Sequence, residues 1–426
     1  MKNISAILTA GGLCLSLSGC LLDGLNPTGS DTPAAAAPVV TPSEAPSSTP
    51  STTPSVTPST FSVGGTVSGL TGSVVLQNNG GDNLSVSANG SFTFATALSD
   101  AATYAVTVLT QPSGEWCTVS SGAGTISGAS VTGVSIVCAV PGSSWTARSL
   151  PSSTNWASVA YGNGVFVTVD DTNSDKAAYS ADGITWTAAT LPSAAGWNFV
   201  TFGNGVFVAI AGRGNSNKVA TSPDGITWTA HTLPSTQNWS SVAYGNGVFV
   251  AVAELTTVAA TSPDGATWTA QALPSALDWV SVTYGNSVFV AIAMDRTVST
   301  SPDGVTWTNT ATALPNVSAN NWYKVTYGNG VFVAVAQLKT MAATSTDGVT
   351  WTAQTLPSLA LWAGLTYGSG VFITTAQGGD KAASSPDGVT WTAQTLPSSG
   401  TWGSVAYGNG IFVTVARGSS KAATSP

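Results

Sequence analysis

Short apolar runs separated by turn residues fill the chain from residue 142 to residue 426. Each run has four to seven residues and is rich in Val, Phe, Trp and Thr, as in Val248-Phe-Val-Ala-Val252. Gly, Asn, Asp and Pro stand between the runs, and no stretch keeps the 3.6-residue apolar period of a helix. This pattern predicts short β-strands joined by tight turns.

One phrase, Ser-Pro-Asp-Gly-x-Thr-Trp, recurs through this region. Complete copies begin at Ser222, Ser262, Ser301 and Ser385, and near copies begin at Ser180 and Ser345. The aspartates of successive copies lie 39 to 44 residues apart. A period of about forty residues indicates a repeat architecture.

A second phrase, Tyr-Gly-Asn-Gly-Val-Phe-Val, follows the first within each unit. The phrase or a close variant starts at Tyr161, Phe202, Tyr244, Tyr284, Tyr327, Tyr367 and Tyr407. Each unit then holds four β-rich runs, the first opened by a Trp and the last containing Thr-Trp-Thr-Ala. Four short antiparallel strands per unit describe a β-propeller blade. The sequence therefore predicts an all-β protein with a seven-bladed propeller of four-stranded blades over residues 141–426.

The aspartate and tryptophan of the first phrase suit a structural role. Asp and Ser side chains hydrogen-bond to turn backbone, and Gly adopts positive φ without strain. Trp is large enough to fill the gap between stacked blades. Because a catalytic residue is unique and these recur six times, we interpret them as structural. The set is Asp182, Trp186, Asp224, Trp228, Asp264, Trp268, Asp303, Trp307, Asp347, Trp351, Asp387 and Trp391.

The motif Ser-x-Asp-Gly-x-Thr-Trp resembles the Asp-box, or BNR, repeat of sialidase-like propellers. The resemblance covers roughly residues 142–426. It implies that each box lies in the turn between the third and fourth strands of a blade and does not itself bind substrate.

The two ends of the repeat region complement each other. Seven Tyr-Gly-Asn-Gly-type phrases stand against six complete boxes, and the chain stops at Ser425-Pro426, where another box would continue. Residues 142–151 match the part that follows a box, with Trp145 as its tryptophan. We expect residues 144–150 to pair with 421–424 and close the ring, which leaves no unmatched blade. The alternative is a chain that has lost a further blade.

The start of the chain predicts export and lipidation. A basic Met1-Lys2-Asn3 precedes an apolar run that ends in Leu17-Ser-Gly-Cys20, typical of a secretory signal. This ending resembles a bacterial lipobox, which implies a signal peptide over 1–19, acylation of Cys20 and, without Asp after it, the outer membrane. The alternative is an ordinary signal with an incidental Cys. Residues 20–60 follow as a Pro/Ser/Thr/Ala-rich tether that we expect to be disordered.

Residues 61–140 predict a separate β module. About seven short alternating runs with hairpin signals such as Asn78-Asn-Gly-Gly81 suggest a small immunoglobulin-like β-sandwich, which loosely resembles bacterial surface-protein modules. Cys117 and Cys138 are the pair left after the signal and the anchor, so a disulfide is expected in an exported protein.

Composition limits the partners. Only 7% of residues are charged, the net charge is −8, and no basic stripe is present, which excludes the usual nucleic-acid interface. A single histidine, His231, makes a metal site improbable, and no nucleotide-binding loop precedes a helix. We predict no metal, no cofactor and no nucleic acid, with the membrane reached through the lipid and a monomeric chain. His231 is interpreted as an exposed polar residue.

Three functions remain open at this stage. A sialidase-like site needs an arginine cluster, a Tyr nucleophile with a Glu partner and an acid Asp. The propeller has four arginines and one glutamate, Glu254, and lacks the Arg-Ile-Pro type motif, so we expect no enzyme. The prediction is a surface lipoprotein whose propeller binds a glycan or an envelope or extracellular protein. The alternatives are a divergent glycoside hydrolase and a purely structural module.

Comparison of the units with one another locates candidate binding residues. The loops after the second strands and between units vary, whereas the Gly-Asn-Gly and box turns are uniform. Loops of the first kind share one face of a propeller, so ligand contacts are expected there and at the axial ends of the first strands. Tyr323 and Lys324 stand where other units mostly have small residues. The candidates are Arg213, Glu254, Arg296, Lys339, Arg417, Asn238, Asp278, Tyr323 and Lys324.

Overall fold

The computed structural model describes residues 59–112, 114–316 and 321–426. Every regular element in these ranges is a β-strand, and none is a helix that could cross a membrane. The predicted signal peptide, the lipidation site Cys20 and nearly all of the tether lie outside the described residues.

Ten strands form the first folded part of the chain. They are β1 (Thr60–Phe61), β2 (Val63–Ser68), β3 (Val74–Asn78), β4 (Asp82–Val86), β5 (Gly90–Thr93), β6 (Leu98–Ser99), β7 (Thr103–Thr110), β8 (Trp116–Ser120), β9 (Ala123–Thr125) and β10 (Val131–Ala139). Two four-stranded sheets have the orders β5-β2-β10-β8 and β4-β3-β7-β9, and β1 pairs with β6. About seven strands were expected, and the additional ones are β1, β6 and β9, which have only two or three residues.

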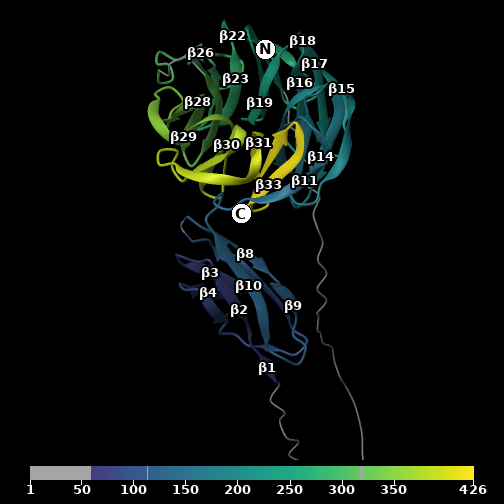
Figure 1. Cartoon of the computed structure of the whole chain (residues 1–426). Coiled ribbons are helices and arrows are strands. Elements are labelled where there is room, and N and C mark those ends of the chain that lie inside the picture. The colour runs from purple at the N-terminus through teal and green to yellow at the C-terminus, as the bar shows by residue number, and fades with distance from the viewer. Residues whose placement is uncertain (1–58, 113, 317–320) are drawn as a thin grey trace, which may run out of the picture. The chain divides into compact units, whose positions relative to one another are not determined.

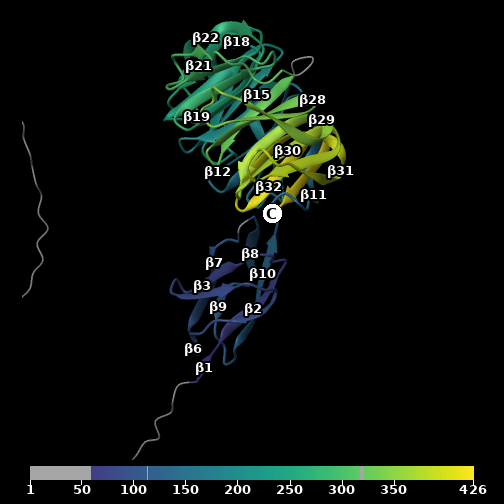
Figure 2. The same cartoon turned by 90° about the vertical axis from the view of Figure 1, so that its left-hand side faces the viewer.

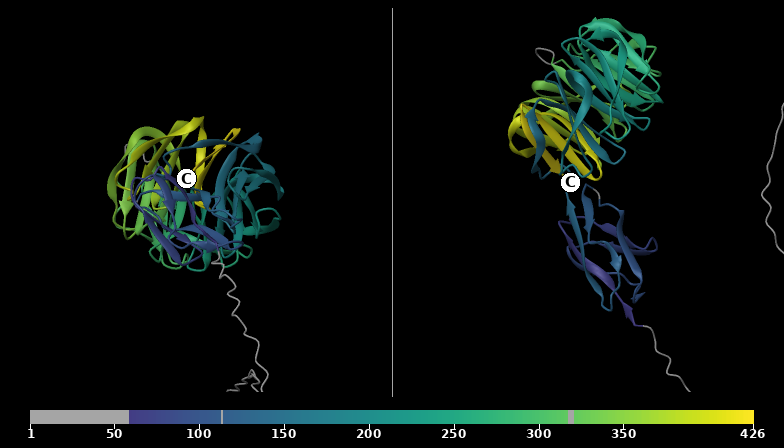
Figure 3. Two further views of the ribbon diagram at one scale, coloured as in Figure 1. Left: turned by 90° about the horizontal axis from the view of Figure 1, so that it is seen from below. Right: turned by 90° about the vertical axis from the view of Figure 1, so that its right-hand side faces the viewer.

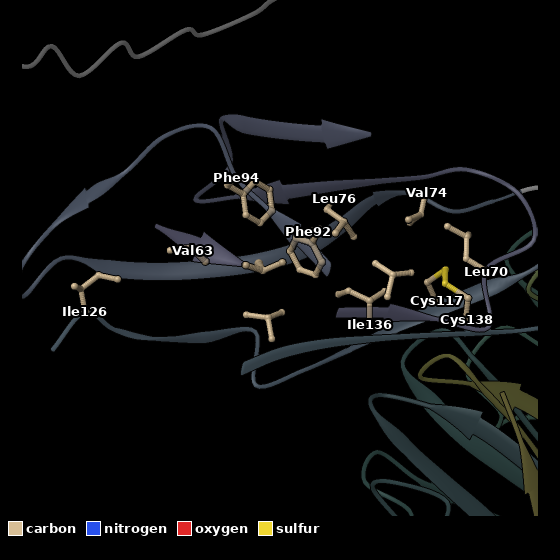
Figure 4. Packing of buried hydrophobic residues seen from close by; sticks show 13 residues of the cluster. Val63, Leu70, Val74, Leu76, Phe92, Phe94, Cys117, Ile126, Ile136 and Cys138 are labelled. Atoms are coloured by element: carbon tan, nitrogen blue, oxygen red, sulfur yellow. A yellow bond between two sulfur atoms is a disulfide. The ribbon is translucent and has the colours of Figure 1, made fainter. Parts of the chain in front are cut away.

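The two four-stranded sheets share one apolar core (Figure 4). Val67 of β2 and Ile136 of β10 come from one sheet and Leu76 of β3 from the other, and all three are buried. Strand alternation aims every second side chain at this core. At one end, Cys117 and Cys138 are directly opposed on β8 and β10 and form a disulfide with an S–S distance of 2.03 Å.

The remaining strands form a β-propeller (Figures 1 and 2). They are β11 (Thr146–Thr154), β12 (Trp156–Gly162), β13 (Val165–Asp170), β14 (Ser174–Ser180), β15 (Thr187–Gly203), β16 (Val206–Arg213), β17 (Ser216–Ser222), β18 (Thr229–Gln237), β19 (Trp239–Gly245), β20 (Val248–Ala253), β21 (Thr256–Ser262), β22 (Thr269–Leu277), β23 (Trp279–Gly285), β24 (Val288–Ala293), β25 (Val298–Ser301), β26 (Thr308–Asn309), β27 (Trp322–Gly328), β28 (Val331–Ser345), β29 (Thr352–Gly368), β30 (Val371–Ser385), β31 (Thr392–Gly408), β32 (Ile411–Arg417) and β33 (Ser419–Ser425).

Several strands are longer than the sequence predicts. Strand β15 has 17 residues; its first part pairs with β14 and its second part pairs with β16, so it runs from the edge of one four-stranded unit into the centre of the next. A Leu-Pro dipeptide follows the last β-rich run of a unit and is a common strand end, yet Pro192 lies inside β15. Proline is tolerated there because the outermost strand of a unit has no neighbour on its far side.

Each box turn is held by its own side chains. In the unit of Asp224, the carboxylate Oδ1 accepts hydrogen bonds from the backbone N–H groups of Ile226 and Thr227, both at 2.9 Å. Gly225 has φ +73°, and its carbonyl accepts from the indole N–H of Trp228 at 3.2 Å. The same pattern at the other boxes explains why Asp, Gly and Trp recur together.

Neighbouring units are linked through the two repeated phrases. A Cβ on Gly203 would lie 2.2 Å from the ring of Tyr244 in the next unit, so only glycine leaves room for that ring. On the same side, the Asn163 side chain donates to the carbonyl of Pro223 at 2.9 Å, which joins a Gly-Asn-Gly turn to the next box turn. The uniform face of the propeller is therefore a network of contacts between units.

The last and first strands of the propeller meet, as the sequence predicts. Strand β11 pairs antiparallel with β33, with Thr146 opposite Thr424 and Ala147 opposite Ala423. Trp145 donates its indole N–H to the carbonyl of Gly142 at 3.0 Å, as the box tryptophans do. Figure 3 shows the colour running from teal through green to yellow around the ring, so that the final strands lie beside the first.

Candidate functional site

Two cavities lie on the axis of the propeller, one beyond the other. The first, the axial cavity, has a volume of about 450 Å³ and opens among the variable loops at Arg213, Glu254 and Arg417. The second, of about 330 Å³, is lined by the inner strands of every unit. Lys324 and Phe199 line both cavities, so they stand where the two join.

The inner strands share one structural position, two residues after the first tryptophan. Its occupants are Ser158, Phe199, Ser241, Ser281, Lys324, Gly364 and Ser404. The serines join neighbouring units: the Oγ of Ser281 accepts from the backbone N–H of Val325 at 3.3 Å, and that of Ser404 accepts from Val159 at 3.0 Å. Phe199 and Lys324 replace this bond with side chains that enter the axis.

Lys324 and Phe199 meet across the channel. The Lys324 Nζ lies 4.2 Å from the centre of the Phe199 ring. Burial, and to a smaller extent the positive charge of Arg417, lower the pKa of Lys324 from its ordinary value to about 7. Among the described residues no carboxylate forms an ion pair with this amine. The neutral form of the Lys324 amine is therefore accessible near pH 7.

A buried carboxylate holds two arginines at the wall of the axial cavity. The Oδ2 of Asp171 lies 2.6 Å from Nη1 of Arg417 and 3.2 Å from Nε of Arg213, and the Asp171 side chain is fully buried. The Oδ1 of Asp171 and the Nε of Arg417 are buried without a hydrogen-bond partner. Two guanidinium groups share one carboxylate, which leaves an excess of positive charge here.

Glu254 faces this positive group within the same cavity. Burial raises the pKa of Glu254, and the negative charge of Asp278 raises it further, while Arg213 acts in the opposite direction. The side-chain amide of Asn238 donates to Glu254 Oε2, and the backbone of Asn238 accepts from the Glu254 N–H at 3.0 Å. The pair is thus fixed from both the side chain and the main chain.

Tyr323 lines the axial cavity beside Lys324. Burial raises the pKa of its phenol, and the charges of Arg417, Glu254, Arg213 and Asp171 also act on it. The hydroxyl therefore stays protonated and can donate a hydrogen bond to a ligand.

The structure brings six of the nine candidate residues together. Arg213, Glu254, Arg417, Asn238, Tyr323 and Lys324 all line the axial cavity. Asp278 does not line it, but its charge acts on Glu254. Arg296 and Lys339 lie outside the lining, and Arg296 instead donates through Nε to the carbonyl of Leu314 at 3.0 Å.

Sequence reasoning missed two residues of this site. Phe199 has the character of an ordinary strand residue. Comparison of the units shows, however, that most of them have serine at its structural position. Asp171 lies in one of the variable loops but is not among the predicted contacts, and its pairing with Arg417 joins residues far apart in the chain.

His231 and Arg148 have one shared structural role. His231 Nε2 lies 2.9 Å from Thr221 Oγ1, and Arg148 Nε donates to Thr424 Oγ1 at 3.0 Å. Three other units place a glutamine there; Gln271 donates to Thr261 at 2.9 Å. Both residues thus link the outer two strands of a unit, and His231 is partly buried, not the exposed residue expected from the sequence. Across the described ranges no group of three or more His, Cys, Asp or Glu side chains is arranged to hold a metal ion.

Several solved propellers are similar to this chain. A streptogramin B lyase structure matches with a TM-score of 0.59 and 12% identity over 66% of this chain and 97% of its own. Selenomethionine-substituted virginiamycin B lyase from Staphylococcus aureus matches with a TM-score of 0.59 and 14% identity, over 66% of this chain and 98% of the lyase. YCF48 bound to D1 peptide matches with a TM-score of 0.52 and 15% identity, over 66% of this chain and 94% of YCF48. At these identities the likeness shows the fold alone.

The expectation that this chain is no enzyme is corrected by these matches. It rested on the missing residues of a sialidase-like site, but two of the similar propellers are lyases. A fold does not determine a function, and the absence of one catalytic set does not exclude another.

One of two sequence comparisons supports the fold. No curated protein sequence matches this chain. Residues 190–329 match the model of the DUF6242 beta propeller domain, so this part of the chain is similar to that family.

Proposed function

We propose that the propeller binds a small carboxylate-bearing glycan in the axial cavity. The observation that carries the proposal is the arginine pair at Asp171, which has more positive than negative charge and faces the cavity. Arg213 is 59% exposed in its side chain and so can turn toward a ligand. Guanidinium groups bind carboxylates through paired, charge-assisted hydrogen bonds.

The other walls of the cavity suit the rest of a sugar. Tyr323 and Phe199 offer aromatic surface, and Asn238 and Glu254 offer polar groups. A volume of about 450 Å³ lies in the range of small-molecule sites, which combine apolar walls with a few placed polar groups.

The binding proposal is tested with glucuronate and glucose as probes in titration calorimetry. Glucuronate binds and glucose binds more weakly, because only glucuronate has a carboxylate for the arginines. Arg213→Gln weakens glucuronate binding roughly tenfold or more, since a hydrogen bond to a charged group contributes about 1.5–3 kcal/mol. The control Lys218→Gln removes a positive charge from the same unit, at an amine that donates instead to the Ala194 carbonyl.

Equal affinity of the two variants for glucuronate, or equal affinity of the wild type for both sugars, contradicts the proposal. Binding of an envelope protein without any binding of glucuronate would favour the protein partner that the sequence also suggests.

We further propose a surface lipoprotein with seven propeller blades, an immunoglobulin-like module before them and an outer-membrane anchor at Cys20. Leu17-Ser-Gly-Cys20 after a basic, apolar start supports the anchor. Acylation at several positions of one cysteine would give stable attachment. A fatty-acid analogue is expected to label the wild type and not Cys20→Ser; equal labelling of both would refute the anchor.

A further inference from the structure

We propose that Lys324 captures carbonyl-bearing anionic ligands as a covalent imine in the axial cavity. This inference rests on the proposed function, because the arginine pair is what selects an anion. It adds a chemical step that simple binding does not require.

The first support is the place of Lys324 in the fold. Its position in β27 corresponds to serines that bridge neighbouring units, as Ser281 does to Val325. Lys324 makes no such bridge to the next unit among the hydrogen bonds of the described residues and instead points its amine over Phe199. A side chain that gives up a repeated stabilising bond to enter a cavity is more consistent with ligand chemistry than with structure.

The second support is the state of the amine. An imine forms from the neutral amine, and burial together with Arg417 brings the pKa of Lys324 to about 7. Three peripheral lysines differ in their contacts, because each Nζ donates to a backbone carbonyl. These are Lys218 to Ala194 at 2.8 Å, Lys381 to Leu359 at 2.9 Å and Lys421 to Ser399 at 2.6 Å.

The step balances without an added oxidant or reductant. The Lys324 nitrogen attacks the carbonyl carbon and forms a C–N bond, while the carbonyl π electrons move to oxygen, which takes up a first proton from the nitrogen to give the carbinolamine. The carbinolamine nitrogen loses a proton, the hydroxyl gains one, and water leaves as the C=N bond forms. Glu254, whose pKa is raised by burial, lines the same cavity and can donate the proton to the departing hydroxyl.

The charges around Lys324 favour a 2-oxo acid as the ligand class. Arg213 and Arg417 share Asp171 and can accept a carboxylate, and both line the cavity into which the amine opens. A carbonyl next to that carboxylate would then be presented to the amine. Glu254, from another unit, brings one carboxylate to the cavity lining, and the protonated Tyr323, which precedes Lys324 on β27, brings no charge.

Reductive trapping tests the proposal. The full chain is incubated at pH 7 with pyruvate and cyanoborohydride, and the modified lysines are located by peptide mass spectrometry. We expect one adduct, at Lys324, formed at least about tenfold faster than at Lys218, Lys381 and Lys421, because Lys324 alone among these is a desolvated amine in the cavity with the arginine pair. These lysines are an internal control that needs no variant.

Two further comparisons sharpen the result. Lys324→Arg keeps the charge and loses the adduct, while Arg213→Gln slows trapping of pyruvate more than trapping of propanal, which has no carboxylate. Labelling of all lysines at similar rates, or none at Lys324, overturns the imine. Equal slowing for pyruvate and propanal overturns the role of the arginines.

The glucuronate experiment separates the two proposals. If glucuronate binds and pyruvate is not trapped, the imine is refuted and the binding site stands. If pyruvate is trapped at Lys324 and glucuronate does not bind, the imine stands and the glycan is the wrong ligand.

Discussion

At the residue scale, Lys324 is an exception within a repeated structure. Serines at its structural position hold neighbouring inner strands together, and glycine stands there only at residue 364. A buried amine without a carboxylate partner is costly in an apolar surrounding. The residue therefore lowers the stability of the ring, which suggests that it is retained for function.

We predict that Lys324→Ser raises the free energy of unfolding by roughly 1–2 kcal/mol at pH 7. Each kcal/mol should raise Tm by about 2–4 °C. The variant removes a buried amine and supplies a hydroxyl that can accept from the backbone of the next unit. The pKa of Lys324 falls from 10.5 to about 7 on folding, so unfolding takes up a proton between these values. The stability of the wild type accordingly rises with pH across this range, and the advantage of the variant shrinks toward pH 10.

Thermal melts across pH 6–10 measure this effect. Lys381→Ser is the matched control, since it removes a peripheral lysine whose amine is exposed. A Lys324→Ser protein that melts at or below the wild type at pH 7 would show that burial of this amine carries no penalty.

The sequence predicts part of the site at this scale. Tyr323 and Lys324 were identifiable because their bulk breaks the repeat. Phe199 breaks it equally but is apolar, and apolar residues in strands are expected. The pKa of Lys324 depends on which groups surround it, and those come from other units of the ring.

At the element scale, the blades are predictable because their information is local. The carboxylate of Asp303 accepts from the N–H groups of residues two and three places on, at 2.9 and 2.8 Å. These bonds lower the pKa of Asp303, with the bond from Thr306 the largest cause. A motif whose bonds span three residues determines its own turn, so the sequence alone locates it.

The continuation of one unit into the next was not predictable in the same way. The Leu-Pro dipeptide usually ends a strand, but in β15 the leucine, Leu191, is buried in the core and the proline lies on the outermost strand. Whether proline ends a strand depends on whether a neighbouring strand requires its missing N–H group, and this depends on the arrangement of the whole sheet.

At the scale of the whole molecule, the site exists only because the ring closes. Asp171 follows β13 near the start of the propeller and Arg417 ends β32 near its finish, yet their side chains are 2.6 Å apart. Contacts of this separation have no local signal in one sequence. Ring closure could be predicted because the incomplete first and last segments of the propeller together make one unit. The ion pair between Asp171 and Arg417 could not be predicted in this way.

The closing strand pair allows a direct prediction. We expect Ala147→Cys with Ala423→Cys to form a disulfide, because these residues are opposed on β11 and β33. The native bridge between Cys117 and Cys138 joins directly opposed residues of antiparallel strands in the same way. The new bridge would close a loop of nearly the whole propeller, worth about 5.6 kcal/mol in the chain-entropy model. The Tm of the oxidised variant should exceed that of the wild type. Reduction should remove this difference, and the wild type treated with the same reductant accounts for the loss of the native bridge.

The matched control is Ala178→Cys with Ala188→Cys, the equivalent opposed pair on β14 and β15. Its loop is only a hairpin, for which the same relation gives about 3 kcal/mol. Both pairs replace alanines at corresponding places in a unit, so the two bridges should carry similar strain. The difference between their gains in Tm then reflects the difference in loop length. If β11 stays on β33 in solution, the closing bridge forms readily in air and raises Tm more than the hairpin bridge does. Failure of the closing pair to oxidise, while the hairpin pair oxidises, would mean that the ring opens at this seam and that the cluster of Asp171 with Arg417 is not held by strand pairing.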